Sequence, residues 1–372
     1  MLSPAAVSHV RRAVRAALAV EGGAEPAWSW QGQVADADFA EAVARHRVSL
    51  VLADHADALG LTGRVRRAVV AQRDEERLGA LAQIRLLASV DELLADIPHL
   101  FFKGAALATL TTGDPAARGE GDVDVLVPPG ALAAAASAIG AAGWEVRPTY
   151  TADQGSWAWR YQRWGAHEMA FDRGTETIDL HWRLGPTYDG LPAFDELWAR
   201  RAAIKVGPVE VDTLGVADTF AHSLHHAAKD GWESLRSLVD VHRLTRDPGV
   251  PHEVTDPAGV ETLSAVQAAL GLPAGAPRFD RTRTPLPRML RAQAAPVRHA
   301  VVPGQRTWRQ AAFRWRTSRS PRDLALNAVT LLLPPASTVT SHDPEPARAI
   351  AASVGHRLHQ VSWKLAGWRT EL

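Results

Sequence analysis

The sequence predicts an α+β fold in which a small mixed sheet lies between two helical regions. Apolar residues recur at spacings of three and four near the start of the chain and again after Gly215, which is the helical period. The middle of the chain instead alternates short valine-rich segments with alanine-rich ones, a pattern typical of strands and helices in alternation. We therefore expect a helical region at 1–95, a sheet-containing region at 96–215 and a second helical region at 216–372.

The first helical region begins with an apolar stripe formed by Val7, Val10, Val14 and Leu18. This stretch is rich in arginine and poor in acidic residues, a composition that transit peptides share. It lacks a hydrophobic signal core and a cleavage site, so we interpret it as an amphipathic helix. The helical spacing continues to about Leu94.

The sheet-containing region shows a regular order of short elements. An apolar entry at His99 leads through Lys103 and Gly104 into an alanine-rich and leucine-rich helix that ends at Gly113. A helix is also expected over Gly130–Ala142. The predicted strands are Asp122–Val127, Trp144–Arg147, Glu168–Phe171, Thr177–Trp182 and the hairpin of Ile204–Val206 with Val209–Val211.

The last third of the chain returns to a helical pattern and then becomes basic. Phe220, Leu224 and Ala228 form an apolar stripe that ends near Gly231, whereas the prolines of 272–304 predict an irregular connection. The segment 278–323 holds twelve arginines against two aspartates and is interleaved with aromatic residues. We interpret it as an amphipathic helix whose arginines cover the edge of a core, in preference to a nucleic-acid surface.

Composition excludes several classes of protein. Lys and Arg together number 41 and balance 41 acidic residues, so the chain lacks the overall positive charge that drives non-specific nucleic-acid binding. The absence of cysteine excludes disulfides, thiolate metal sites and cysteine nucleophiles. No apolar run reaches the length of about 18 residues that a membrane span needs. We expect a soluble cytoplasmic protein.

Two aspartates share one face of a predicted strand. Side chains alternate along a strand, so Asp122 and Asp124 lie on the same side, about 7 Å apart, while Val123 and Val125 face a core. Carboxylate oxygens at this spacing can bind one or two divalent cations, and they favour Mg²⁺ or Mn²⁺ over Zn²⁺. The alternative is a solvated polar face, which is common for such a pattern.

A third carboxylate joins the first two if two predicted strands are neighbours. Asp179 and His181 share one face of their strand, opposite Ile178 and Leu180. Adjacent strands would bring Asp179 to Asp122 and Asp124, and three carboxylates on a rigid sheet would hold a cation. Otherwise Asp179 and His181 form an exposed polar edge.

Two further groups of residues have side chains that can bind ligands. Lys103 and Gly104 stand at the start of a predicted helix, where an ammonium and free backbone N–H groups can bind a polyphosphate. A simple turn is the alternative. His222, His225 and His226 have helical spacing, but no glutamate base accompanies them, so we favour structural or substrate-facing histidines over zinc ligands.

In combination these motifs resemble the uncharacterised nucleotidyltransferase family of the DNA polymerase beta-like superfamily. The resemblance covers roughly residues 40–245. It rests on a run of segments in order: Lys103-Gly104, Arg118 to Val127, a helix ending in Ala142-Gly143-Trp144, Ile178 to Trp182, and His225 to Trp232 with Leu235 and Asp240.

The resemblance implies a polymerase-type palm that moves a nucleoside monophosphate from a nucleoside triphosphate, preferably ATP, to a hydroxyl or similar acceptor on a small molecule or a protein. Pyrophosphate is released. By the same resemblance, the catalytic and metal-binding residues are Asp122, Asp124 and Asp179, which hold Mg²⁺ or Mn²⁺.

The residues expected near the triphosphate are Lys103, Gly104 and Arg118, although Arg118 can instead brace the loop before its strand. The chain departs from the superfamily here, because the usual Gly-Gly or Gly-Ser pair is Lys103-Gly104 and lies further from Asp122. The competing hypothesis is a non-catalytic palm that binds RNA or a protein partner through the basic C-terminal third.

Overall fold

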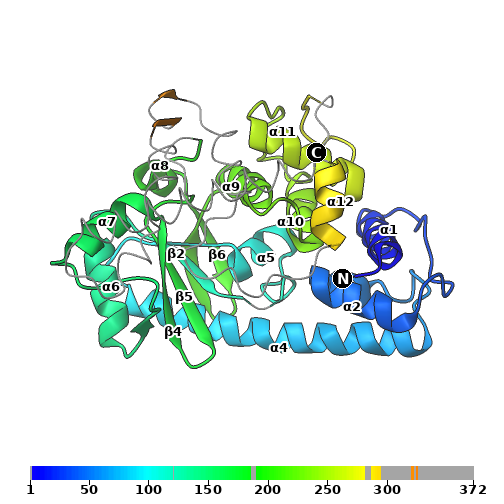
Figure 1. Ribbon diagram of the computed structural model, residues 1–372, viewed down its shortest axis with the longest axis horizontal. Helices are drawn as coiled ribbons and strands as arrows, with labels where there is room; N and C mark the ends of the chain where they lie inside the picture. The colour runs from blue at the N-terminus through cyan, green and yellow to red at the C-terminus, as the bar shows by residue number, and fades with distance from the viewer. Residues whose placement is uncertain are drawn as a thin grey trace, which may run out of the picture.

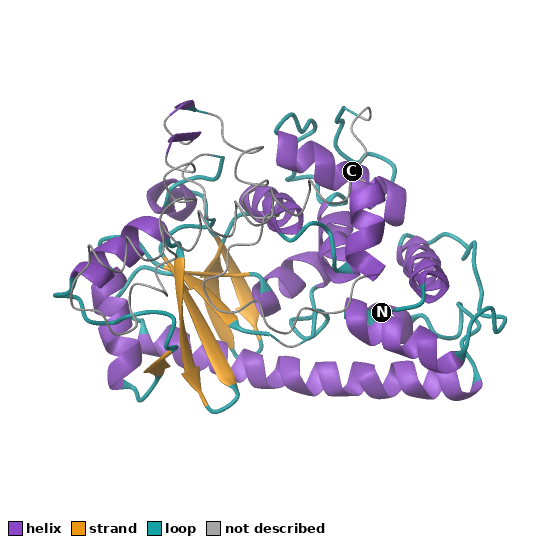
Figure 2. Ribbon diagram, viewed as in Figure 1, coloured by secondary structure: helices purple, strands orange, loops and turns teal. Residues whose placement is uncertain are grey.

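The computed structural model describes residues 2–119, 121–185, 190–280, 286–294, 320–321 and 324–325. Within this part of the chain a seven-stranded mixed sheet is flanked by helices, which confirms the predicted α+β class (Figure 2). The strand order is β3-β4-β5-β2-β1-β7-β6. The central strand β2 therefore lies between β5 and β1.

Four helices precede the sheet, as the apolar spacing predicted. They are α1 (Pro4–Glu21), α2 (Asp36–His46), α3 (Ser49–Asp54) and α4 (Gly63–Leu93). The predicted stripe of α1 is buried, which fits an amphipathic helix packed on a core. α4 has 31 residues, so it is about 46 Å long at the usual rise, and it runs beneath both the sheet and the first helices (Figure 1).

Six of the seven strands agree closely with predicted segments, whereas β1 was not predicted as a strand and Asp122 lies just before β2. The strands are β1 (Leu100–Phe102), β2 (Val123–Leu126), β3 (Glu145–Val146), β4 (Glu168–Arg173), β5 (Glu176–His181), β6 (Ala202–Val206) and β7 (Val209–Thr213). β2 pairs in parallel with β5 and antiparallel with β1, while β4 with β5 and β6 with β7 form antiparallel hairpins.

Four helices lie within the sheet-containing region: α5 (Gly104–Thr112), α6 (Leu132–Ala141), α7 (Trp157–Gly165) and α8 (Phe194–Ala199). α5 and α6 match predicted helices. α7 and α8 had no counterpart among the predicted elements. α7 is rich in tryptophan and tyrosine, which have only moderate helix propensity, and its start is fixed by the Ser156 hydroxyl, which accepts from the Trp159 N–H at 3.1 Å.

The C-terminal helices are α9 (Val216–Lys229), α10 (Leu235–Leu244), α11 (Pro257–Ala269) and α12 (Leu286–Ala294). α12 corrects the prediction of an irregular connection over 272–304. Its proline falls in the first turn, where a helix tolerates it, and the helix is held by burial of Met289 and by the Gln293 side chain, which donates to the Trp232 carbonyl at 3.1 Å. Most of the basic segment 278–323 lies outside the described residues, so its predicted role stays a prediction.

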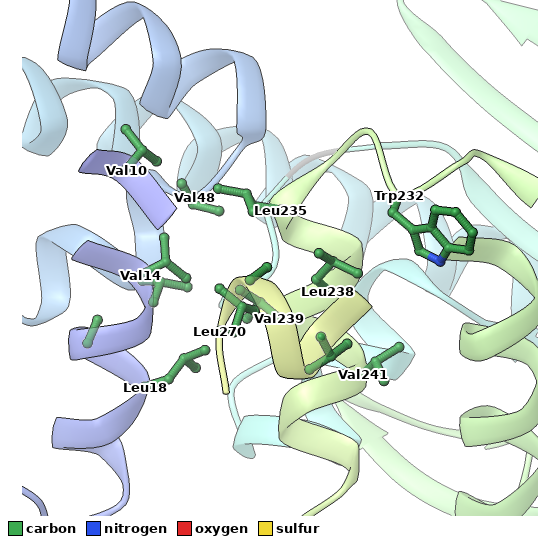
Figure 3. Close-up of a cluster of buried hydrophobic side chains, with 14 of the residues drawn as sticks. Val10, Val14, Leu18, Val48, Trp232, Leu235, Leu238, Val239, Val241 and Leu270 are labelled. Atoms are coloured by element: carbon green, nitrogen blue, oxygen red, sulfur yellow. The ribbon is translucent and has the colours of Figure 1, made fainter. Parts of the chain in front are cut away.

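Two main apolar cores organise the molecule. The first, called here the helical core, joins α1, α2 and α3 to α9, α10 and α11, and Figure 3 shows Val14 and Leu18 on one side of this cluster and Leu235 and Leu238 on the other. The second lies on one face of the sheet beneath α6. α4 contributes to both, through Val65 at one end and Ile84 toward the other. The division of the chain into three regions stays a prediction.

Candidate active site

The predicted meeting of the aspartate strands depends on the pairing of β2 with β5. These strands are neighbours, and Asp124 lies directly opposite Asp179 in the parallel register. The alternate residues of both strands, among them Val125 and Ile178, are fully buried in the sheet core. Because one face is so strongly apolar, the register is fixed, and the aspartates share the other face.

Asp179 shows how closely the carboxylates approach one another. Burial and the charges of Asp122, Glu168 and Asp124 raise the pKa of Asp179 to about 10, and its carboxyl group hydrogen-bonds to Asp122. Asp179 therefore lies next to both other aspartates, opposite Asp124 in the sheet and hydrogen-bonded to Asp122. Asp122 itself is exposed, lies just before β2 and is not among the described residues that form a group with metal-site geometry. Like charges held this close favour either a proton or a bound cation between them.

Asp124 has the opposite electrostatic environment. Its side chain is buried, with Lys103 Nζ at 2.5 Å and His181 Nε2 at 3.0 Å from the same oxygen, Oδ1. Burial by itself would raise the pKa of Asp124, but Lys103 and His181 hold it down at about 2. Asp124 is thus ionised at neutral pH, with one of its oxygens shared by two cationic or hydrogen-bonding groups.

The backbone at Lys103 is strained. Lys103 has φ 59° and ψ −157°, a conformation that is essentially restricted to glycine, and Gly104 follows with φ 41°. A Cβ atom at Gly104 would lie 2.8 Å from Nε2 of Gln83, and that same amide donates to the Asp122 carbonyl. Gln83 on α4 therefore joins the lysine turn to the first aspartate.

Arg118 lies in the loop that precedes β2 and is held by the helical part of the molecule. Its Nε donates to Asp240 Oδ2 of α10 at 2.9 Å, and both side chains are largely buried. This contact fits the predicted bracing role. A contact of Arg118 with the triphosphate stays a prediction.

Glu168 and His167 also belong to this site, although neither was singled out from the sequence. Glu168 lies opposite His181 in the hairpin of β4 and β5, with its Oε2 atom 3.5 Å from His181 Nδ1 and 3.2 Å from His167 Nε2. Pairing across a two-residue turn at Gly174 fixes this register, so counting back from the turn would have placed Glu168 beside His181.

The histidines of α9 cover the polar face of the sheet. His222 packs edge-on against Phe102, with ring centroids 5.1 Å apart, and stacks on His226. Burial and the positive charges of nearby lysines hold the pKa of both imidazoles well below the usual range. His225 instead pairs with Asp256, its Nε2 3.2 Å from Oδ1.

Two groups of described side chains have the geometry of a metal site, and both contain His181. Asp124, Asp179 and His181 form one, with ligand atoms within 4.8 Å of one another. Its oxygen-rich donor set, together with the crowding at Asp179, fits a hard divalent cation. The second consists of His167, Glu168 and His181. Neither contains a histidine of α9.

Comparison with known proteins identifies the family. The model of the family described as "Uncharacterised nucleotidyltransferase" matches residues 33–253, a range that includes the whole of the site described above. No curated protein and no solved structure matches the chain. In the part of the chain that the structure describes, no helix is long and apolar enough to span a membrane. The match extends over more than half of the sequence, and the chain belongs to this nucleotidyltransferase family.

Proposed function

We propose that the protein transfers a nucleoside monophosphate from a nucleoside triphosphate, preferably ATP, to a hydroxyl or similar acceptor on a small molecule or a protein. Pyrophosphate is the second product. Family membership supports nucleotidyl transfer in general. The observation that carries the finer proposal is the register that places Asp124 opposite Asp179, with Asp122 hydrogen-bonded to Asp179.

In this proposal Asp122, Asp124 and Asp179 hold Mg²⁺ or Mn²⁺. Divalent ions at such a site stabilise the entering and leaving oxygens of a phosphoryl group during in-line displacement. The carboxylates supply hard oxygen ligands on two paired strands, whose buried alternate residues keep them from shifting. By the family resemblance, Asp179 is also the candidate proton acceptor for the attacking hydroxyl.

Lys103, Gly104 and Arg118 are proposed to lie on the triphosphate side of the site. The Lys103 ammonium already contacts Asp124, so it carries a positive charge next to the carboxylates. The strained turn places Gly104 at the start of α5, where free N–H groups favour phosphate oxygens. Arg118, fixed by Asp240, keeps the loop before β2 in place.

The proposal can be tested without knowledge of the acceptor. Each of the four nucleoside triphosphates is titrated into the protein by calorimetry, with Mg²⁺, with Mn²⁺ and with a chelator, and pyrophosphate release is followed in parallel. We expect one nucleotide to bind only with a divalent cation, and both Asp124→Asn and Asp179→Asn to abolish that binding.

A matched control is Asp212→Asn, which removes a strand aspartate of the same sheet whose partner is Arg201, 2.9 Å away. We expect this variant to bind nucleotide as the unmodified protein does. Cation-dependent binding that survives in both Asp124→Asn and Asp179→Asn would contradict the proposed site.

A further inference from the structure

A cluster with mixed nitrogen and oxygen donors lies next to the three aspartates, and none of its residues is assigned a step in the proposed transfer. It consists of His167, Glu168 at the start of β4, and His181 at the end of β5. Glu168 Oε2 is the central atom, 3.2 Å from His167 Nε2 and 3.5 Å from His181 Nδ1.

The imidazole of His181 turns its Nδ1 atom toward this cluster. Its Nε2 lies 3.0 Å from Asp124 Oδ1 and donates to it, because an ionised carboxylate only accepts. Nδ1 is the other ring nitrogen. This atom is buried, makes no hydrogen bond among the described residues, and faces the Glu168 carboxylate; the His181 side chain is 1% exposed. A ring nitrogen without a proton and a carboxylate oxygen at this distance repel each other, and a metal ion bound by both removes that repulsion.

The distances match those around a small metal ion. Zn²⁺ binds histidine nitrogen and carboxylate oxygen at about 2.0–2.2 Å, so tetrahedral ligands lie about 3.3–3.5 Å from each other. Glu168 Oε2 lies 3.2 Å from His167 Nε2 and 3.5 Å from His181 Nδ1, close to this range, and all three ligand atoms lie within 4.8 Å of one another. The other nitrogen of His181 donates to Asp124, which is the carboxylate–histidine arrangement that orients metal ligands in proteins.

We propose that His167 Nε2, Glu168 Oε2 and His181 Nδ1 form a second cation site, specific for a divalent transition metal of the zinc class. Two nitrogens and one carboxylate favour such ions over Mg²⁺. Three protein ligands leave a position for water or for an oxygen of a bound molecule. Through His181 the site is coupled to Asp124, yet it does not depend on the proposed nucleotidyl transfer, because it needs no nucleotide.

Titration of the metal-free full-length protein with Co²⁺ tests the site, because four-coordinate Co²⁺ absorbs visible light strongly and six-coordinate Co²⁺ only weakly. We expect one equivalent to give strong absorption that excess Mg²⁺ does not remove. His167→Ala and Glu168→Gln should each weaken this binding at least tenfold. The control is His99→Ala. His99 pairs with Asp91 at 3.1 Å and belongs to neither group of described residues with metal-site geometry, so this variant should bind Co²⁺ as the unmodified protein does.

Asp179→Asn separates this proposal from the proposed function. The variant should lose cation-dependent nucleotide binding and keep the Co²⁺ absorption. The opposite result, absorption lost in Asp179→Asn and retained in His167→Ala, would assign the metal to Asp124, Asp179 and His181 and overturn the second site.

A measurement on the unmodified protein avoids any folding defect of the variants. X-ray absorption at the zinc edge of the Zn²⁺-loaded protein should show two imidazole ligands at about 2.0–2.1 Å. A spectrum with oxygen ligands alone, or the absence of stoichiometric Zn²⁺ binding, would show that a proton rather than a metal lies between His181 and Glu168.

Discussion

The helical core consists of apolar side chains, whereas the polar face of the sheet carries charged and polar ones. The helical core contains valine, leucine and aromatic side chains from α1 to α3 and from α9 to α11, and Trp232 and Phe39 are almost completely buried there. The polar face gathers Lys103, Asp124 and His181, all largely shielded from solvent. Burial of apolar groups stabilises a fold, whereas burial of charges opposes folding unless each is paired.

This contrast indicates where stability and function reside. The charges of the polar face are kept in place by the apolar face of the same strands and by the helices around them. Asp124 and Asp179 are direct neighbours, yet the pKa of Asp124 falls to about 2, against the effect of burial, and that of Asp179 rises to about 10, in the direction that burial favours. Substitutions on the polar face should therefore alter activity much more than stability, and those in the helical core the reverse.

The largest effect is expected from Asp179→Asn. Loss of a metal-binding carboxylate should lower nucleotidyl transfer by about 10³-fold, which corresponds to about 4 kcal/mol. Removal of a crowded carboxylate should at the same time raise the midpoint of thermal unfolding in the absence of divalent cations. Steady-state rates and calorimetric unfolding measure the two effects, and a variant that lost both activity and stability would break the comparison.

The second effect belongs to the helical core. Leu238 is fully buried, so Leu238→Ala should lower the free energy of unfolding by about 2–5 kcal/mol, since the substitution removes apolar contacts and leaves a cavity. Leu78 on α4 is 68% exposed, and Leu78→Ala is the matched control, expected to change stability by less than about 0.5 kcal/mol. Denaturant unfolding gives both values. Nucleotide binding by the folded fraction of Leu238→Ala should be retained.

The third effect is a loss of stability in acid that originates beside the helical core. His46, at the end of α2, is fully buried, and burial followed by the charges of Arg45 and Arg11 lowers its pKa from 6.5 to about 3. As the pH falls, the unfolded chain therefore takes up a proton on His46 before the folded chain does. The stability that results from this difference is complete above the pKa of His46 in the unfolded chain and is lost as the pH falls toward its pKa in the folded chain.

For His46 this loss amounts to about 2 kcal/mol between about pH 7 and pH 5. His46→Gln should flatten that part of the stability profile, while substitution of the exposed His252 should not. An unchanged acid slope in His46→Gln would show that the buried imidazole does not remain neutral.

The smallest effect tests the strain at the polar face. Lys103→Gly and Lys103→Ala both remove the ammonium, but only glycine adopts φ 59° and ψ −157° without steric cost. We expect the glycine variant to be more stable than the alanine variant by about 1 kcal/mol, and both to bind nucleotide poorly. Equal stability of the two variants would mean that the backbone relaxes when the lysine is lost.

The sequence was sufficient for the strands that carry the aspartates. Alternation of valine with aspartate in β2, and of Ile178 and Leu180 with Asp179 in β5, fixes which side chains share a face. Their pairing could be stated only as a condition, because periodicity within a strand says nothing about its neighbour. The register of Asp124 with Asp179 confirms that condition.

Contacts between segments that are far apart in the sequence could not be predicted from local sequence patterns. Arg118 and Asp240 are 122 positions apart, and no local pattern links them. The environment of Lys103 depends on Asp124 and on the side of α4 that carries Gln83, so neither its strain nor its ion pair follows from the residues beside it. α12 depends on a tertiary contact with Trp232 that proline content does not reveal.

The length of α4 has a mechanical consequence. One continuous helix is embedded in the helical core near Val65 and in the sheet core near Ile84, and between these points Gln83 holds the backbone of Asp122. A rotation of α4 about its own axis, or a shift along it, would therefore move the entrance to β2. A molecule that binds to the first helices and moves α4 would therefore also change the positions of the aspartates.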